Sequence, residues 1–316
     1  MQQIPRIFLE LVALVGLSLL LFTMLMQDLK INNIIPVIGV FAAAAFRIMP
    51  SVNRIIGQFQ IIRYGMPIIN KINKEITQIN FEENYLNISD EKILFKDKIQ
   101  LENVEYSYET RSQIVLSNIT FEVPLYSQIG IVGESGSGKS TLVNLMLGLL
   151  KPNKGEVKVD GKNIQSNLKS WQHQIGYVPQ NIYLMDDTLK NNIALGEETE
   201  DIDDKLIKDA VKLSGLQNFI SNLPNGLDTI VGERGAQISG GQLQRVGIAR
   251  ALYNKPKVLI LDEATSSLDL DTEKNLMKEI EKLKGTITLI IISHRLSTIS
   301  NCDKILKIKG GKINTN

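Results

Sequence analysis

The chain has 316 residues, a length that predicts about two domains. Its formal net charge of only +1 excludes the strong positive field typical of proteins that bind nucleic acids. The one cysteine, Cys302, excludes an intramolecular disulfide framework and fits a reducing compartment.

Two apolar segments lie in the first fifty residues. Residues 7–26 form a run of about 20 apolar residues, interrupted only by Glu10, which is enough to cross a bilayer core of about 30 Å. A signal peptide and a buried core helix are the alternatives. The length of the run, Glu10 and the lack of a small-residue cleavage site argue against the signal peptide. Residues 34–50 are shorter and carry Arg47, but a short polar link joins the two segments, so we predict a membrane-spanning hairpin of helices at about 7–26 and 34–50.

Basic residues follow the second apolar segment: Arg54, Arg63, Lys71 and Lys74. The positive-inside rule places this end in the cytoplasm. We predict a membrane part with a cytoplasmic extension over residues 1–78, a charged and irregular linker over 79–98, and a soluble α/β domain over 99–316. Unbroken apolar runs at 129–132, 258–261 and 287–292 fit parallel strands buried on both faces.

A phosphate-binding loop follows the first of these strands. The sequence GESGSGKST, residues 133–141, fits the pattern G-x-x-x-x-G-K-[ST]. Glycines let backbone N–H groups close around the phosphates of a nucleotide, Lys139 adds a positive charge, and the Ser140 hydroxyl is a ligand for Mg²⁺. The predicted nucleotide-binding residues of this loop are Gly133, Ser135, Gly136, Ser137, Gly138, Lys139, Ser140 and Thr141.

Two acidic residues end the strand VLILDE, residues 258–263. Asp262 is placed to hold Mg²⁺ through water, and Glu263 is placed to polarise an attacking water as a general base. The alternative is an ordinary strand end that carries two acids.

A family resemblance rests on residues 237–245, QISGGQLQR, which resemble the signature motif of ATP-binding cassette (ABC) proteins, with Ile238 where leucine is usual. Other motifs of that family occur in the chain in the family's order. They imply that Tyr108 is the adenine-stacking aromatic, that Gln180 of the Q-loop is a nucleotide and Mg²⁺ ligand, that Asp269 belongs to the D-loop, and that His294 is the switch histidine. The resemblance implies a P-loop NTPase cassette, an α/β domain with a mixed sheet and a helical subdomain. It also implies ATP and Mg²⁺ as cofactors and two cassettes paired head to tail. Each ATP would then lie between the phosphate loop of one cassette and the signature of the other, Ser239, Gly240, Gly241 and Gln242, while His294 contacts the γ-phosphate.

A second resemblance separates exporters from other cassettes. Residues 229–235, TIVGERG, resemble the TxVGERG segment of exporter cassettes, in which Glu233 would sense the membrane domain. Together with the membrane hairpin, this resembles an export-type half-transporter in a multi-pass arrangement in the inner or plasma membrane, with the cassette in the cytoplasm. A second half-transporter, forming a homodimer, is the expected partner. Two helices cannot enclose a pathway where six are usual, so we expect the chain to be a fragment.

Residues 34–55 are similar to the last membrane helix of lipid-linked oligosaccharide flippases of the protein-glycosylation type. Arg47 and Arg54 share a helix face, which suggests contact with a phosphate-bearing lipid head group. The alternative is snorkelling of both side chains at the membrane interface.

A soluble cassette ATPase acting on nucleic acid or ribosomes, and a truncated chain that binds ATP without transport, remain alternatives, whereas a small GTPase is excluded because no N-K-x-D motif occurs. Tyr126 stands where a turn glycine is common. Trp171 and His173 are interpreted as packing and surface residues.

Overall fold

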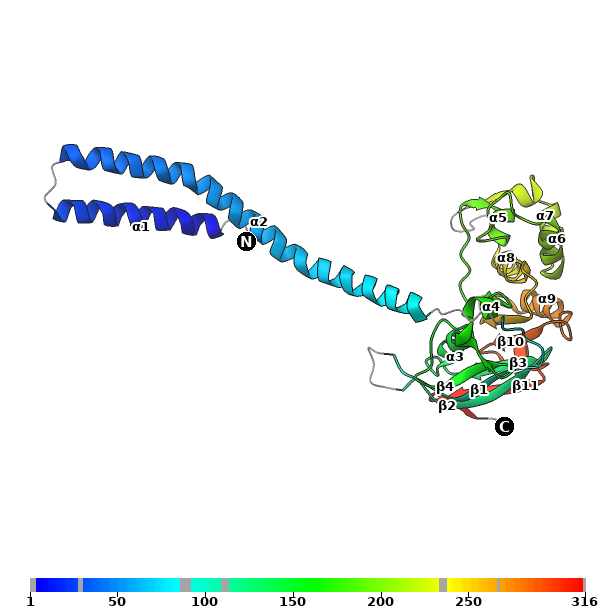
Figure 1. Cartoon of the computed structure of the whole chain (residues 1–316). Coiled ribbons are helices and arrows are strands. Elements are labelled where there is room, and N and C mark those ends of the chain that lie inside the picture. The colour runs from blue at the N-terminus through cyan, green and yellow to red at the C-terminus, as the bar shows by residue number, and fades with distance from the viewer. Residues whose placement is uncertain are drawn as a thin grey trace. The chain divides into compact units, whose positions relative to one another are not determined.

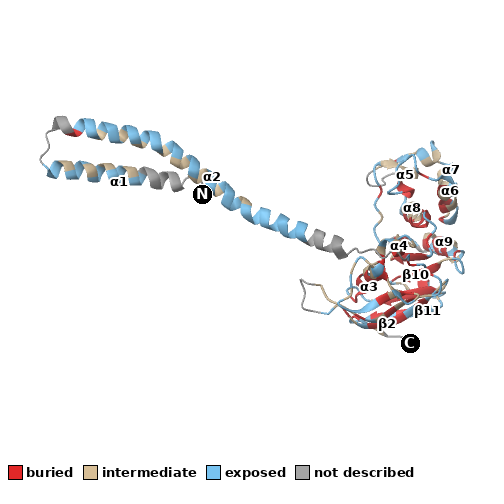
Figure 2. Cartoon of the chain, in the orientation of Figure 1, coloured by how far each residue is buried: buried red, intermediate tan, exposed pale blue. Residues whose placement is uncertain are grey.

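The computed structural model describes residues 4–27, 31–85, 92–108, 114–232, 238–265 and 268–314 (Figure 1). The chain divides into two compact units, Met1–Tyr85 and Leu86–Asn316. Figure 2 shows that buried residues are concentrated in the sheets and helices of the second unit, whereas the helices of the first unit are largely exposed.

The first unit consists of two helices, α1 (Ile4–Met26) and α2 (Ile31–Tyr85), which pack against each other. Large apolar side chains are exposed on both; Leu14 is 69% exposed and Phe46 80% exposed. Within the described residues, one helix is long and apolar enough to cross a membrane, over Ile34–Thr77, and the apolar part of α1, Leu11–Met26, is shorter.

Helix α2 is longer than the sequence suggested. It continues to Tyr85, into the segment that was expected to be a linker, and it contains three prolines, at positions 36, 50 and 67. No glycine or proline lies between position 68 and Tyr85, so nothing in the local sequence ends the helix earlier.

The second unit is built on a mixed six-stranded sheet in the order β12-β11-β3-β10-β9-β6. Five of its strands are parallel, and β12 pairs with β11 in the antiparallel sense. All residues of β9 and β10 are buried, as their unbroken apolar sequences predict. The strand bounds are β3 (Gln128–Gly133), β6 (Ile175–Val178), β9 (Val258–Asp262), β10 (Thr288–Ile292), β11 (Lys304–Lys309) and β12 (Lys312–Asn314).

An antiparallel four-stranded sheet, in the order β2-β1-β4-β5, completes the core. Its strands are β1 (Lys98–Tyr106), β2 (Leu116–Pro124), β4 (Lys154–Val159) and β5 (Lys162–Asn163). Residues of both sheets and of helix α3 (Lys139–Met146) form one buried apolar cluster. Trp171 lies in this cluster and donates from Nε1 to the backbone oxygen of Met146 at 2.8 Å, so it is a packing residue as predicted.

Most of the remaining helices gather around a second apolar cluster that includes α8 and the other face of β9. The bounds are α4 (Leu168–Gln172), α5 (Leu189–Ile193), α6 (Asp204–Leu213), α7 (Gln217–Ser221), α8 (Gly240–Leu252), α9 (Leu270–Glu281) and α10 (Leu296–Ile299), with single 3₁₀ turns η1 (Ile164–Ser166) and η2 (Gly226–Asp228). A short antiparallel pair, β7 (Asp187–Thr188) and β8 (Ile230–Val231), joins the α5 region to the chain before α8.

Candidate functional site

The phosphate loop connects the end of β3 to the start of α3. Gly136 and Gly138 have φ angles of 77° and 105°, a region that favours glycine, and Gly138 is the N-cap of α3. A Cβ added at Gly133 would lie 2.5 Å from both the Ile308 backbone oxygen and Ser137 Oγ. The glycine spacing read from the sequence is therefore required by backbone geometry at these positions.

Lys139 is folded back across this loop. Its side chain is only 6% exposed, and Nζ donates to the backbone oxygens of Gly133 at 2.9 Å and Glu134 at 3.1 Å. Its ammonium also lies 3.8 Å from Glu263 Oε1. The positive charge is thus held beside both the loop and the predicted general base.

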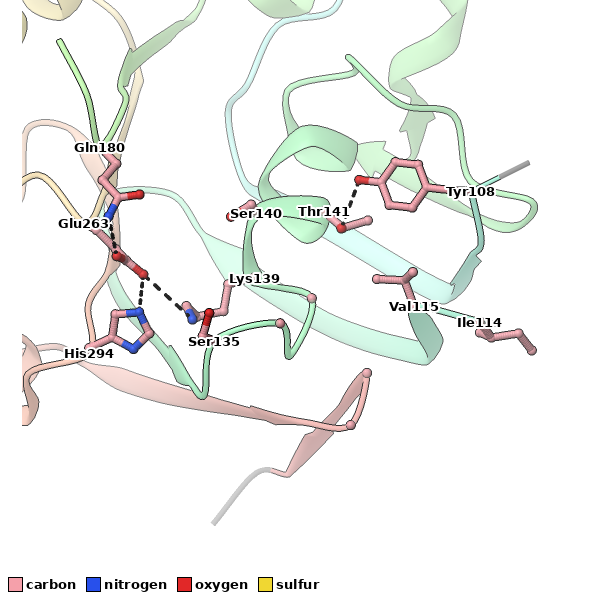
Figure 3. Close-up of a pocket in the computed structure, with 14 residues that line it drawn as sticks. Tyr108, Ile114, Val115, Ser135, Lys139, Ser140, Thr141, Gln180, Glu263 and His294 are labelled. Carbon is pink, nitrogen blue, oxygen red and sulfur yellow. Dashed lines mark hydrogen bonds and ion pairs between the residues drawn. The ribbon is translucent and has the colours of Figure 1, made fainter. Parts of the chain in front are cut away.

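A cavity of about 560 Å³ opens over the loop (Figure 3). Its volume falls in the range of small-molecule sites, about 300–1,000 Å³. Figure 3 shows Tyr108 and Val115 on one side, Gln180, Glu263 and His294 on the other, and Lys139 between them. The predicted site residues that line it are Tyr108, Ser135, Gly136, Gly138, Lys139, Ser140, Thr141, Gln180, Glu263 and His294.

Four lining residues were not found by sequence reasoning: Ile114, Val115, Gly310 and Gly311. The two glycines form the turn between β11 and β12, and both have positive φ angles. A Cβ at Gly311 would lie 2.3 Å from the Val115 backbone oxygen, so the chain from β2 and the C-terminal hairpin meet closely here. The adjacent glycines were a local signal of a tight turn, but nothing in the sequence placed that turn at the cavity.

Glu263 is the residue on which the polar groups of the cavity converge. Gln180 Nε2 donates to its Oε2 at 3.0 Å, and His294 Nε2 lies 2.5 Å from its Oε1. Its φ angle is 51°, and its backbone N–H donates to the Ile292 oxygen at 3.0 Å. A non-glycine residue in this region of φ is strained, and such strain is concentrated at functional sites.

Asp262, the last residue of β9, is 9% exposed and does not line the cavity. Tyr177 on β6 donates from its hydroxyl to Asp262 Oδ2 at 3.2 Å. Burial raises the pKa of the Asp262 carboxyl and, together with the nearby Asp262 charge, raises the pKa of Tyr177 to about 12. Tyr177 therefore stays protonated and remains a donor to Asp262.

The donor set fits Mg²⁺ held together with phosphates. Mg²⁺ is usually bound by one or two protein groups plus substrate phosphates, without a dedicated protein cage. Among the described residues, no group of three or more His, Cys, Asp or Glu side chains could hold a metal ion. Ser140 and Gln180 line the cavity, and the buried Ser137 Oγ has no hydrogen-bond partner within the described structure.

Tyr108 closes one side of the cavity. Its hydroxyl lies 3.3 Å from Thr141 Oγ1, and its ring stands perpendicular to that of Tyr106, with centroids 5.0 Å apart. An aromatic face at the rim of this cavity is suited to stacking on a base.

The signature residues lie at the start of α8, outside the lining of the cavity. Ser239 is the N-cap of α8 and forms a capping box with Gln242: Gln242 N donates to Ser239 Oγ at 3.3 Å, and Ser239 N donates to Gln242 Oε1 at 3.0 Å. Asp269 caps α9 by accepting from the Thr272 N–H at 3.0 Å. Among the described residues, neither Asp269 nor any of Ser239, Gly240, Gly241 and Gln242 lines the cavity, and Glu233 lies outside the described residues.

The family profile described as ABC transporter matches residues 116–266, which contain the phosphate loop, the signature and Glu263. These residues are an ABC transporter cassette. The α/β fold with a mixed sheet and helical part, preceded by a long apolar helix, confirms the fold expected from the sequence resemblance.

The cassette and the helices before it are both similar to known exporters. A protein of Pasteurella multocida named ATP-dependent lipid A-core flippase is 36% identical over 315 residues, which cover 92% of this chain and 54% of the relative. Its namesake in Haemophilus influenzae is 42% identical over 69% of this chain and 37% of the relative. The solved structure of a bacterial Atm1-family ABC exporter with ATP bound matches 97% of this chain and 52% of its own, with a TM-score of 0.67 and 29% identity. The chain therefore spans about half or less of the length of these relatives. Because the relatives are a flippase and an exporter, the alternative of a soluble cassette ATPase that acts on nucleic acid or ribosomes is not favoured.

Proposed function

We propose that this chain is the ATP-binding and ATP-hydrolysing part of an ABC exporter that moves an amphipathic, lipid-linked molecule across a membrane. The observation that carries the proposal is the convergence of Lys139, Gln180 and His294 on the Glu263 carboxylate inside one cavity beside the phosphate loop. These are the groups that phosphoryl transfer to water requires: a charge clamp, a metal ligand and a base.

The chemical roles follow from the geometry. Glu263 would accept a proton from the attacking water, and Lys139 would transfer its hydrogen bonds from the loop carbonyls to the phosphates of ATP. Ser140, Gln180 and Asp262 would hold Mg²⁺, Asp262 through water, and Mg²⁺ would supply charge neutralisation at the phosphates. His294 would move from Glu263 to the γ-phosphate.

A second cassette would complete the site. Ser239 caps α8, which begins at Gly240, and the N-terminus of a helix favours an anion; Asp269 caps α9. Neither segment lines the cavity of its own chain. A head-to-tail partner half-transporter, in a homodimer, would bring its signature to this cavity. The Atm1-family match supports a half-transporter of this type.

The membrane part would consist of α1 and α2 as a hairpin, with the cassette in the cytoplasm and the protein in the inner or plasma membrane. Arg47 and Arg54 are both exposed on α2 and lie seven positions apart, on one face of the helix. A lipid-linked substrate with a phosphate-bearing head group would neutralise them. The relatives named lipid A-core flippases support a substrate of this class.

The test is Mg²⁺-dependent release of phosphate from ATP by the full chain in lipid nanodiscs. We expect hydrolysis by the wild type, none above background by Glu263→Gln, and retained ATP binding in both. If the wild-type chain failed to bind ATP, the proposed function would be wrong.

A further inference from the structure

A buried carboxylate lies outside the cavity, on the first turns of α9. The Glu273 side chain is 6% exposed, although glutamate is almost never buried without partners. It accepts a hydrogen bond from Thr265 Oγ1 at 3.0 Å and another from Thr298 Oγ1 at 2.6 Å, and it forms an ion pair with Arg295. The Glu273 carboxylate thus connects α9 with two other segments. One is the chain after β9, which carries Thr265, and the other is α10 with the residue before it, which carry Thr298 and Arg295.

Two of the residues that bind Glu273 lie close to residues of the cavity in the sequence. Arg295 directly follows His294, and Thr265 comes two residues after Glu263. Arg295 is also fixed at its backbone, where its N–H donates to Ser293 Oγ at 2.9 Å. The His294 side chain is itself 45% exposed, so little packing holds it against Glu263 and its position depends on the backbone around it.

The buried ion pair and hydrogen bonds of Glu273 are a poor way to stabilise the fold alone, because burying charged groups costs free energy of folding. Replacing a buried ion pair by apolar side chains of similar volume is often neutral or stabilising. Burial opposes the charge of Glu273, but the hydrogen bonds from Thr298, Arg295 and Thr265 outweigh it and hold the pKa of this carboxyl below its ordinary value. The carboxylate is therefore charged at neutral pH and binds Arg295 as an ion.

We propose that Glu273 is a positioning residue that holds the His294 segment and the Glu263 segment in register, so that the histidine reaches the reacting phosphate. This inference rests on the proposed function, because it assigns Glu273 to the same hydrolytic site. Glu273 itself does not touch the cavity.

The test is Glu273→Gln in the full chain, which keeps the size of the side chain and removes its charge. We expect turnover of ATP to fall about 10- to 100-fold, as for a misplaced reacting group, while KM for ATP stays within about twofold. The matched control is Glu279→Gln on the same helix, which removes an ion pair with Lys282 at the surface and should leave turnover unchanged. Added to His294→Ala, Glu273→Gln should cause no further loss, because the histidine through which it acts is gone.

Thr298 provides a second variant in case Glu273→Gln fails to fold. Thr298→Val removes one of the three donors and should lower turnover, whereas Thr298→Ser keeps the hydroxyl and should restore it. Equal turnover in these two variants, or additive losses for Glu273→Gln and His294→Ala, would overturn the proposal in favour of a purely structural role.

A spectroscopic measurement is independent of hydrolysis. The chain has only two histidines, His173 and His294, and His173 is exposed on the surface, away from the cavity lining. In a chain labelled with ¹³C at histidine, Glu273→Gln should shift or broaden the His294 imidazole signal and leave that of His173 unchanged. An unchanged His294 signal would refute the positioning role even if the wild type hydrolyses ATP. A wild type without hydrolysis would refute the proposed function, and the histidine signals would then still decide the role of Glu273.

Discussion

His294 Nε2 lies 2.5 Å from Oε1 of Glu263, although the two residues are far apart in the sequence. The sheet brings them together: β9 and β10 are parallel neighbours in which Asp262 pairs with Ile292, and the Glu263 N–H then donates to the Ile292 oxygen. Each residue follows the carboxyl end of its strand. Ligands of open α/β sheets bind at this edge, and the phosphate loop after β3, next to β10, opens there as well.

Glu263→Gln tests the general base. The amide keeps the hydrogen-bonding shape of the carboxylate but cannot accept a proton at neutral pH, so we expect hydrolysis to fall about 10²- to 10⁴-fold. ATP affinity should be retained or increased, because the variant removes a negative charge near the phosphates. Phosphate release and the binding of a fluorescent ATP analogue measure the two effects. Hydrolysis at the wild-type rate would remove Glu263 from this role.

Lys139→Ala tests the phosphate loop. The substitution removes the ammonium that lies beside Gly133 and Glu263. Hydrogen bonds to charged groups contribute about 1.5–3 kcal/mol, so ATP affinity should fall about 10- to 100-fold. Lys307→Ala, at an exposed position of β11, is the matched control and should bind ATP as the wild type does. Unchanged affinity in Lys139→Ala would show that the phosphates bind elsewhere.

The parts of the site that could be predicted from the sequence are those in which local pattern and chemistry coincide. The loop 133–141 needs its glycines for backbone conformation, and the unbroken apolar run 258–261 needs burial on both faces, so both were visible without a structure. The wall formed by Val115 and Gly311 was not predictable, because it depends on the packing of segments far apart in the chain. The hydrogen bond from Tyr177 to Asp262 arises in the same way, from the lateral pairing of β6 with β9.

Tyr126→Gly should stabilise the cassette. Tyr126 has a φ angle of 60° in the turn between β2 and β3, where a non-glycine residue costs about 1–2 kcal/mol. Its side chain is 48% exposed, and its N–H donates to Thr288 Oγ1 at 2.7 Å, a bond that glycine can also make. Part of the gain is offset by the greater flexibility of glycine in the unfolded chain, so we expect about 1 kcal/mol, or a rise of about 2–4 °C in melting temperature. Tyr126→Ala removes the ring but keeps the strain, and it should give no such rise; an equal rise in both variants would assign the effect to the ring.

Asp262→Asn should change the dependence of stability on pH. Burial raises the pKa of Asp262 above its ordinary value of about 3.9, so the folded protein binds this proton more tightly than the unfolded chain does. The contribution of this group therefore favours folding at low pH and is lost as the pH rises through the raised pKa. Asparagine carries no charge at any pH and keeps an oxygen that can accept from Tyr177, so the variant should escape this loss.

The measurement is the melting temperature of the full chain without nucleotide or Mg²⁺, from pH 4 to pH 8. We expect the difference between Asp262→Asn and wild type to increase in favour of the variant as the pH rises. With Mg²⁺ and ATP the order should reverse, because the carboxylate that destabilises the empty fold is the one that would hold the metal. Asp271→Asn, at an exposed position of α9, is the control and should follow the wild type. A difference that does not vary with pH would mean that Asp262 is solvated in the folded protein.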